Sequence, residues 1–106
     1  MKIDSVAMEQ AADEAIDLLK ALSNRHRLLI ICQLIDRERS VGELAKLLKL
    51  RISTVSQHLA LLRRDSLVSA RREAQTIFYT LASEPACGVL KTLYQVFCGP
   101  KSGTAR

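Results

Sequence analysis

Residues 40–81 contain the pattern that most restricts the fold of this chain. Two short helix-forming segments follow one another closely there, and two strand-forming segments come next. The first helix is expected over residues 41–48, and the second contains the sequence STVSQHL at residues 53–59. Residues 67–72 and 76–81 are expected to form strands on either side of a short polar turn. This is the order of a winged helix-turn-helix, in which the second helix lies in the major groove of DNA and the hairpin reaches the flanking backbone.

Local signals support these helices. Ser40 and Glu43 have the spacing of a capping box, in which each side chain accepts a hydrogen bond from the backbone amide of the other residue. Apolar residues then recur at helical spacing, which gives each helix one buried face. These residues are Leu44, Leu47 and Leu48 in the first helix, and Val55, Leu59 and Leu62 in the second.

The second helix also carries short polar side chains beside or opposite its apolar stripe. They are Ser53, Thr54, Ser56, Gln57 and His58. Such groups can bond to base edges or phosphates, although the same pattern also fits an ordinary solvated helix face. Charge favours DNA contact, because residues 51–72 hold five arginines and one aspartate, a net charge of +4, whereas residues 1–22 have a net charge of −3. Positive charge gathered on one segment is expected of a phosphate-binding surface.

The hairpin supplies a second group of candidate contacts. Residues 76–81 alternate weakly and are rich in β-branched and aromatic residues, which suits a strand. Arg71, Arg72 and Gln75 are expected at the tip of the hairpin, where we predict that they contact phosphates or the minor groove.

Three further helices are predicted. Residues 7–22 are rich in alanine, leucine and acids, and Ser23 or Asn24 can cap a following helix that runs to about residue 36. The last helix begins at residues 83–85, where Pro85 occupies an early helical position, and it extends to residue 98. The predicted fold is therefore mainly α with a β-hairpin wing, in the order four helices, two strands and a final helix.

One domain is expected over residues 7–98, with flexible ends at residues 1–6 and 99–106. The net charge of +5 and the pI near 9.5 suit an anionic partner. No apolar run approaches the roughly 20 residues that span a bilayer, and the N-terminus lacks the features of a signal peptide. We therefore expect a cytoplasmic protein that has no membrane partner, and no motif calls for a cofactor.

The three cysteines have no CxxC or zinc-like spacing. Cys87 and Cys98 are eleven residues apart on one predicted helix, which separates them by about 16 Å along its axis. A disulfide needs α-carbons within about 7 Å, so an intrachain bond must involve Cys32 with either of the others. Cys32 falls on the apolar stripe of its helix, and a buried cysteine is usually inert.

Several motifs resemble the ArsR/SmtB family of bacterial repressors. They are VGEL at residues 41–44, VSQHLALLR at 55–63 and EAQTIFY at 73–79, and the resemblance extends over roughly residues 15–98. It implies a homodimer formed through the first and last helices, which binds double-stranded operator DNA and leaves it when an inducer acts.

Two departures from the family pattern stand out. Arg51 and Ile52 replace the Ser-Gln that many relatives have at the start of the second helix, which removes a favourable cap. Ser66 replaces the usual glycine before the wing, so a left-handed turn there would carry strain.

Within this family, the persulfide- and redox-responsive group (the BigR, SqrR and HlyU type) has one cysteine in the second helix and one at the end of the last helix. Cys32 and Cys98 match those positions. The resemblance implies that reactive sulfur species or oxidants join these two thiols by a disulfide or a longer polysulfide bridge. Cys87 is outside this pattern, and we interpret it as structural or incidental.

Three other functions are compatible with parts of the sequence. The alternative nearest to the proposed one is a metal-responsive repressor. The resemblance implies that such a protein would hold its metal on cysteines of the helix at residues 41–48 or on histidines and carboxylates of the last helix, but residues 41–48 contain no cysteine and the last helix contains no histidine. Two thiols could still supply a Cu(I) site or half of a soft-metal site. No metal-binding residues are therefore predicted. An enzyme is disfavoured because no catalytic motif is present. A winged helix that binds only protein would not show salt-dependent DNA binding.

Overall fold

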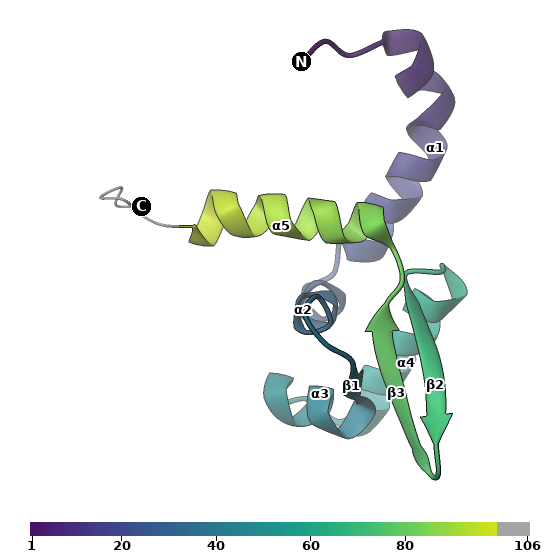
Figure 1. Cartoon of the computed structure of the whole chain (residues 1–106), viewed down its shortest axis with the longest axis vertical. Helices are drawn as coiled ribbons and strands as arrows, with labels where there is room; N and C mark the ends of the chain where they lie inside the picture. The colour runs from purple at the N-terminus through teal and green to yellow at the C-terminus, as the bar shows by residue number, and fades with distance from the viewer. Residues whose placement is uncertain (100–106) are drawn as a thin grey trace.

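The computed structural model describes residues 1–99, and within them the chain forms five helices and a three-stranded sheet (Figure 1). The elements are α1 (Ser5–Leu22), α2 (Arg25–Gln33), β1 (Arg39–Ser40), α3 (Val41–Leu48), α4 (Ile52–Arg64), β2 (Val68–Glu73), β3 (Thr76–Leu81) and α5 (Glu84–Cys98). The predicted winged helix-turn-helix is confirmed, with one strand more than expected.

The helix-turn-helix is formed by α3 and α4, and the predicted capping box begins it. The Ser40 Oγ atom accepts a hydrogen bond from the Glu43 amide at 3.1 Å, and the Ser40 amide donates to Glu43 Oε1 at 3.0 Å. At the other end of α3, Lys49 turns the chain with a left-handed φ of 57°. Arg51, the N-cap of α4, makes no side-chain capping bond, as its departure from the family pattern predicted.

The sheet has the order β1-β3-β2, and both pairings are antiparallel. β2 and β3 form the predicted hairpin, in which Val68 lies opposite Leu81 and Glu73 lies opposite Thr76. β1 was not predicted from the sequence. Two residues are too few to show a periodic pattern, and β1 exists because Arg39 and Ser40 pair with the free edge of β3.

Two turns in and beside the wing use left-handed backbone at residues other than glycine. Ser66, which follows α4, has a φ of 64°, and Ala74 in the hairpin turn has a φ of 57°. This region costs a residue with a Cβ atom roughly 1–2 kcal/mol. The strain predicted at Ser66 is therefore present.

One apolar core holds the helix-turn-helix against α2. Its largest fully buried side chains are Ile30, Ile31, Leu44, Val55, Leu59 and Leu62. Ala21 and Leu22 extend this core from the end of α1, and Ala86 and Leu90 extend it from α5. The orientation of α4 is thus fixed by its buried stripe.

Arginine side chains cap the ends of two helices. The Arg27 Nε atom donates to the carbonyl of Ala21 at 2.7 Å at the end of α1, and the Arg39 Nε atom donates to the carbonyl of Gln33 at 2.8 Å at the end of α2. The last carbonyls of a helix have no partners within the helix and attract cations. These two arginines therefore serve the fold.

Two helix boundaries differ from the prediction. One of them is the start of α1, which lies within the segment 1–6 that was predicted to be a flexible end. α1 begins at Ser5, two residues earlier than expected, because the Asp4 side chain accepts hydrogen bonds from the amides of Val6 and Ala7. α2 ends at Gln33 and not near residue 36. The predicted tail, apart from Gly99, lies outside the described residues.

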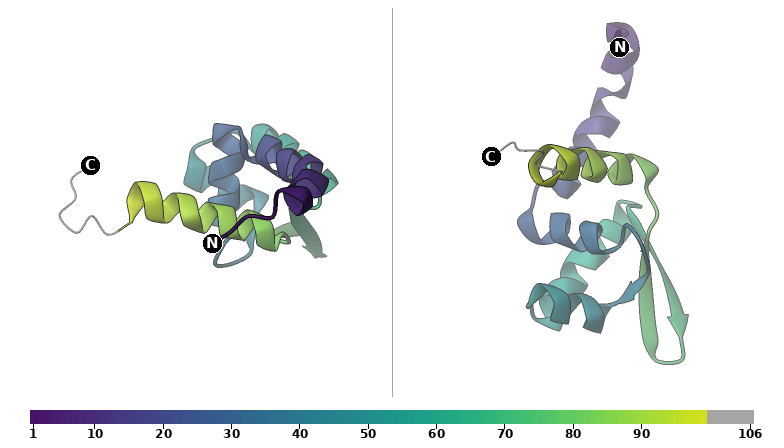
Figure 2. Two further views of the ribbon diagram at one scale, coloured as in Figure 1. Left: turned by 90° about the horizontal axis from the view of Figure 1, so that it is seen from above. Right: turned by 60° about the vertical axis from the view of Figure 1, so that its left-hand side comes forward.

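The outer part of α1 and the far end of α5 extend from the body, and the hairpin points away from α1 (Figure 2). Among the five helices described, none combines the length and the apolar character needed to cross a membrane.

Candidate nucleic-acid interface and thiol pair

The outward face of α4 carries four of the eight predicted DNA contacts. Ser53, Ser56 and Gln57 are exposed, and Thr54 is half-buried. On the opposite side Val55 and Leu59 are completely buried, so packing of the helix directs these polar groups to solvent.

His58 lies differently from the prediction that it belongs to the outward polar face. Its ring meets that of His26 in α2 edge to face, with 5.6 Å between the ring centroids. Its Nδ1 atom is buried and has no hydrogen-bond partner among the described residues. Burial lowers the pKa of His58, and the nearby charges of Arg27 and His26 lower it further. His58 therefore faces α2, because it is on the flank of α4 that packs against that helix.

The predicted hairpin residues separate into two groups. Gln75 lies in the turn, and Arg72 is exposed on β2 beside it. Arg71 was expected at the tip, and this is wrong: it lies opposite Phe78 in the middle of the hairpin. Successive residues of a strand point to opposite faces, so Arg71 and Arg72 face different surroundings.

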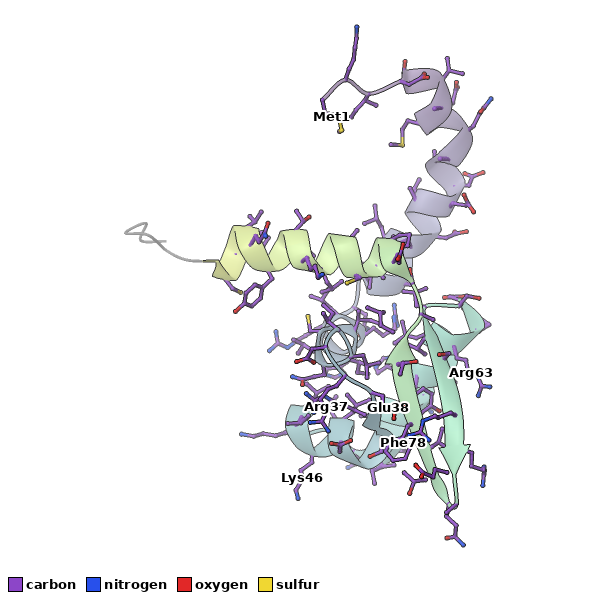
Figure 3. The ribbon with its side chains drawn as sticks, viewed as in Figure 1. Met1, Arg37, Glu38, Lys46, Arg63 and Phe78 are labelled. Carbon is purple, nitrogen blue, oxygen red and sulfur yellow. The ribbon has the colours of Figure 1, made fainter. Side chains whose placement is uncertain are left out.

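Arg71 is held by two carboxylates and an aromatic ring. Its Nε and Nη2 atoms donate to the two carboxylate oxygens of Glu38 at 2.9 and 2.6 Å, and its Nη1 atom donates to Glu73 at 3.2 Å. The guanidinium carbon also lies 4.8 Å from the centre of the Phe78 ring. Glu38 and Phe78 lie next to each other beside β3 (Figure 3).

These contacts change the pKa values of both partners. The hydrogen bonds and charges of Glu38 and Glu73 raise the pKa of Arg71, while the hydrogen bond from Arg71 lowers the pKa of Glu38. Glu38, which immediately precedes β1, was not predicted as a functional residue. In the sequence it is only one acidic residue in a polar stretch, and its pairing with Arg71 depends on the fold.

All three cysteines are free thiols. Cys32 is exposed on α2, so the prediction that it lies on the buried side of its helix is wrong. The buried face of α2 is formed by Ile30, Ile31 and Leu34. Cys32 is next to Ile31 in the sequence but lies outside this face. Cys98, the last residue of α5, is also exposed, whereas Cys87 is half-buried.

The thiol of Cys32 has a raised pKa. Partial burial raises the pKa of the Cys32 thiol, and negative charge on Cys98 raises it further. Such an interaction weakens with distance and is screened by salt beyond about 10 Å. The two thiols thus interact through space although 65 residues lie between them in the sequence. No group of three or more His, Cys, Asp or Glu side chains within residues 1–99 is arranged to hold a metal ion.

Large apolar side chains are exposed on both projecting helices. On α1, Val6 is 63% and Leu19 is 54% exposed, and on α5, Tyr94 is 65% and Val96 is 63% exposed. Several large apolar groups on two adjacent elements are typical of a protein-protein interface.

The close succession of α3 and α4, the polar outward face of α4 and the three-stranded wing define a winged helix-turn-helix DNA-binding protein. Residues 24–70 match the sequence profile of the family described as "Bacterial regulatory protein, arsR family". The transcriptional activator HlyU of Vibrio cholerae is 50% identical over 91 residues, which are 86% of this chain and 84% of HlyU. The chain therefore belongs to the arsR family and is a transcription regulator.

Solved structures of related proteins have the same fold. Reduced HlyU from Vibrio cholerae superposes with a TM-score of 0.82 at 50% identity, covering 87% of this chain and 97% of that one. The transcriptional repressor BigR from Xylella fastidiosa superposes with a TM-score of 0.87 at 38% identity, covering 92% and 100%. The homodimeric winged helix-turn-helix domain of Mb0332 from Mycobacterium bovis superposes with a TM-score of 0.73 at 30% identity, covering 91% and 89%.

Proposed function

We propose that this regulator is a homodimeric repressor whose affinity for operator DNA is switched by a bond between Cys32 and Cys98. Its DNA contacts come from α4 and from the tip of the wing. They are Ser53, Thr54, Ser56, Gln57, Arg72 and Gln75. All of them except the half-buried Thr54 are exposed, and this exposure and the net charge of +5 support the assignment.

The dimer is formed through α1 and α5. The exposed Val6, Leu19, Tyr94 and Val96 supply apolar surface that a second copy would cover. Both helices project from the side of the molecule that lies away from the hairpin tip (Figure 2), so a partner there leaves α4 and the wing free. The Mb0332 domain, which shares this fold and is described as homodimeric, supports the formation of a dimer.

The observation that carries the switch is that two exposed thiols come from different helices, Cys32 from α2 and Cys98 from the end of α5. The effect of Cys98 on the pKa of Cys32 is consistent with their pairing. Exposure allows a small sulfur compound to reach them, which reaction of a thiol requires. A structure of the relative HlyU described as reduced is consistent with redox chemistry in that protein.

The chemistry with an organic persulfide, RSSH, needs no further oxidant. One cysteine thiolate attacks the outer sulfur atom, giving a protein persulfide, Cys–S–SH, and releasing the thiol RSH. The second thiolate attacks the cysteine sulfur of that persulfide, so that a disulfide forms and H₂S leaves. If both cysteines become persulfides, they condense to a trisulfide with release of one H₂S. Peroxide gives the disulfide through a sulfenic acid, with two molecules of water as the other product.

The bridge would act through the position of α5. It would tie the end of α5 to α2, which packs against α4, while α5 also holds the partner subunit. The two recognition helices of a dimer must lie about 34 Å apart, one turn of DNA, so a shift of α5 weakens binding. Couplings between two sites are typically about 1–3 kcal/mol, which corresponds to a roughly 5- to 150-fold change in affinity.

The test measures DNA affinity and protein mass together. Fluorescence anisotropy with a selected duplex would compare the reduced protein with protein treated with an organic persulfide or with peroxide, and mass spectrometry would identify the bridge. We expect Cys32→Ser and Cys98→Ser to bind DNA and to lose the response, and Cys87→Ser to keep it. The proposal fails if Cys98→Ser is still released from DNA by persulfide. Release of the reduced protein by zinc or Cu(I) would instead favour a metal-responsive regulator.

A further inference from the structure

Ile52 is an apolar residue on the part of the molecule proposed to meet DNA. It is the first residue of α4 and is 60% exposed. The other branched apolar residues near it on this helix, Val55 and Leu59, are completely buried. Single exposed apolar residues are common on proteins, and Ile52 is distinguished from them by its position on α4.

The two flanks of α4 have different neighbours. At about 100° per residue, Ile52 and Ser56 lie roughly 40° apart around the helix, whereas Ile52 and His58 lie roughly 120° apart. His58 contacts His26 of α2, so Ile52 and Ser56 lie on a different flank of α4 from the one that packs against α2. By the same spacing Ile52 lies roughly 20° from the buried Leu59, at the edge of the buried stripe. It is exposed because it is in the first turn of the helix, where no other part of residues 1–99 covers it.

The start of α4 is also uncovered. Arg51 makes no side-chain capping bond over the first turn, and Ser53 and Ser56 beside Ile52 are exposed. In a helix-turn-helix, the N-terminal residues of the second helix are those that reach base edges. Ile52 therefore occupies a position from which a side chain can read sequence.

We propose that Ile52 determines part of the operator preference by packing against the C5 methyl group of a thymine in the major groove. This inference rests on the proposed entry of α4 into that groove. An isoleucine side chain has no hydrogen-bond donor or acceptor, so it cannot pair with the polar groups that the other base edges display. The thymine methyl is the apolar group in that pattern, and apolar side chains recognise it by contact.

The expected size follows from the burial of one methyl group. Such burial corresponds to roughly a fourfold change in affinity. A dimer would make the contact once in each half-site, so loss of both methyl groups should weaken binding roughly 16-fold.

The experiment removes the methyl group and nothing else. A preferred duplex is first selected from a random pool with the reduced, full-length protein. Each thymine in that duplex is then replaced in turn by uracil, which keeps the base pair and its hydrogen-bonding groups. Affinities of the wild-type protein and of Ile52→Ala are measured for every duplex. Leu47→Ala is the matched control, because Leu47 is an exposed apolar residue (49%) on α3.

We expect one thymine per half-site whose replacement costs the wild type and Leu47→Ala about fourfold and costs Ile52→Ala almost nothing. Circular dichroism would establish that Ile52→Ala is folded, and Ile52→Val should show a smaller version of the same effect. The inference is overturned if every uracil substitution costs Ile52→Ala as much as the wild type.

Failure of this inference can be distinguished from failure of the proposed function. If the protein binds its selected duplex and releases it with persulfide, but no uracil position interacts with residue 52, only the role of Ile52 is refuted. If no duplex is selected from the pool, DNA binding and the role of Ile52 are refuted together.

Discussion

An arginine in the wing can either position the wing within the protein or contact a DNA phosphate. Replacing Arg71 with glutamine would show which of these two roles Arg71 has. The side chain is already bonded to Glu38 and Glu73 and lies over Phe78. A guanidinium occupied in this way releases no counterion from DNA when the complex forms. We therefore expect Arg71 to position the wing against the segment before β1, and Arg72, which is exposed on the same strand, to contact phosphate.

The magnitude comes from counterion release. Each phosphate contact contributes about 0.9 to the slope of log affinity against log salt concentration, so loss of one contact per protomer lowers the slope of a dimer by about 1.8. Between about 50 and 200 mM salt, the affinity of Arg72→Gln should then fall roughly tenfold less than that of the wild type. Arg71→Gln should keep the wild-type slope.

The assay is fluorescence anisotropy with one duplex at a series of salt concentrations, for the wild type, Arg71→Gln, Arg72→Gln and Glu38→Gln. Arg71→Gln and Glu38→Gln should bind somewhat more weakly at every salt concentration, because each loosens the wing. If Arg71→Gln lowers the slope as much as Arg72→Gln does, Arg71 is itself a phosphate contact and the reasoning is refuted.

Three further predictions concern the turn before the wing, a histidine and the thiols. Ser66→Gly should raise the free energy of unfolding by about 0.5–1 kcal/mol, because glycine relieves the strain at a φ of 64° but costs some backbone entropy. Urea unfolding at a fixed protein concentration would measure this change, and a lower unfolding midpoint would contradict the prediction. Because the pKa of His58 is lowered in the folded state, the unfolded chain takes up a proton first, so stability is fully present above the ordinary pKa of 6.5 and declines as pH falls through that value. The melting temperature should therefore depend on pH less steeply near pH 6 in His58→Gln, and an unchanged dependence would exclude His58 as the cause. Cys98→Ser should lower the pKa of Cys32, because charge on Cys98 raises that pKa, and should therefore speed the alkylation of Cys32 by iodoacetamide. Mass spectrometry would follow the alkylation at Cys32, and an equal or slower rate would argue against an interaction between the two thiols.

The helix-turn-helix could be predicted because its signals are local. A capping box needs only Ser40 and Glu43 at the right spacing, and the stripe of α4 needs only Val55, Leu59 and Leu62 on one side. The hairpin was predictable for the same reason, since two strand-forming segments flank a short turn.

The errors concern features that depend on distant parts of the chain. β1 exists only because β3 offers it a free edge, and Glu38 matters only because Arg71 lies against it. Cys32 was assigned to the buried side because it follows Leu28 and Ile31 at helical spacing. The packing of α2 on its neighbours buries Ile30, Ile31 and Leu34 and leaves Cys32 exposed. The pairing of Cys32 with Cys98 is implied by the family resemblance and could not be predicted from periodicity or spacing.

The way α1 meets the rest of the chain has a consequence for the protein in the cell. Of its 18 residues, only Ala21 and Leu22 are buried. A helix this long gains little from its own backbone in water and normally depends on packing for its stability. If a second copy provides that packing, then a dilute chain would lose much of α1, and the amount of regulator that a cell makes would determine how much of it is competent to bind DNA.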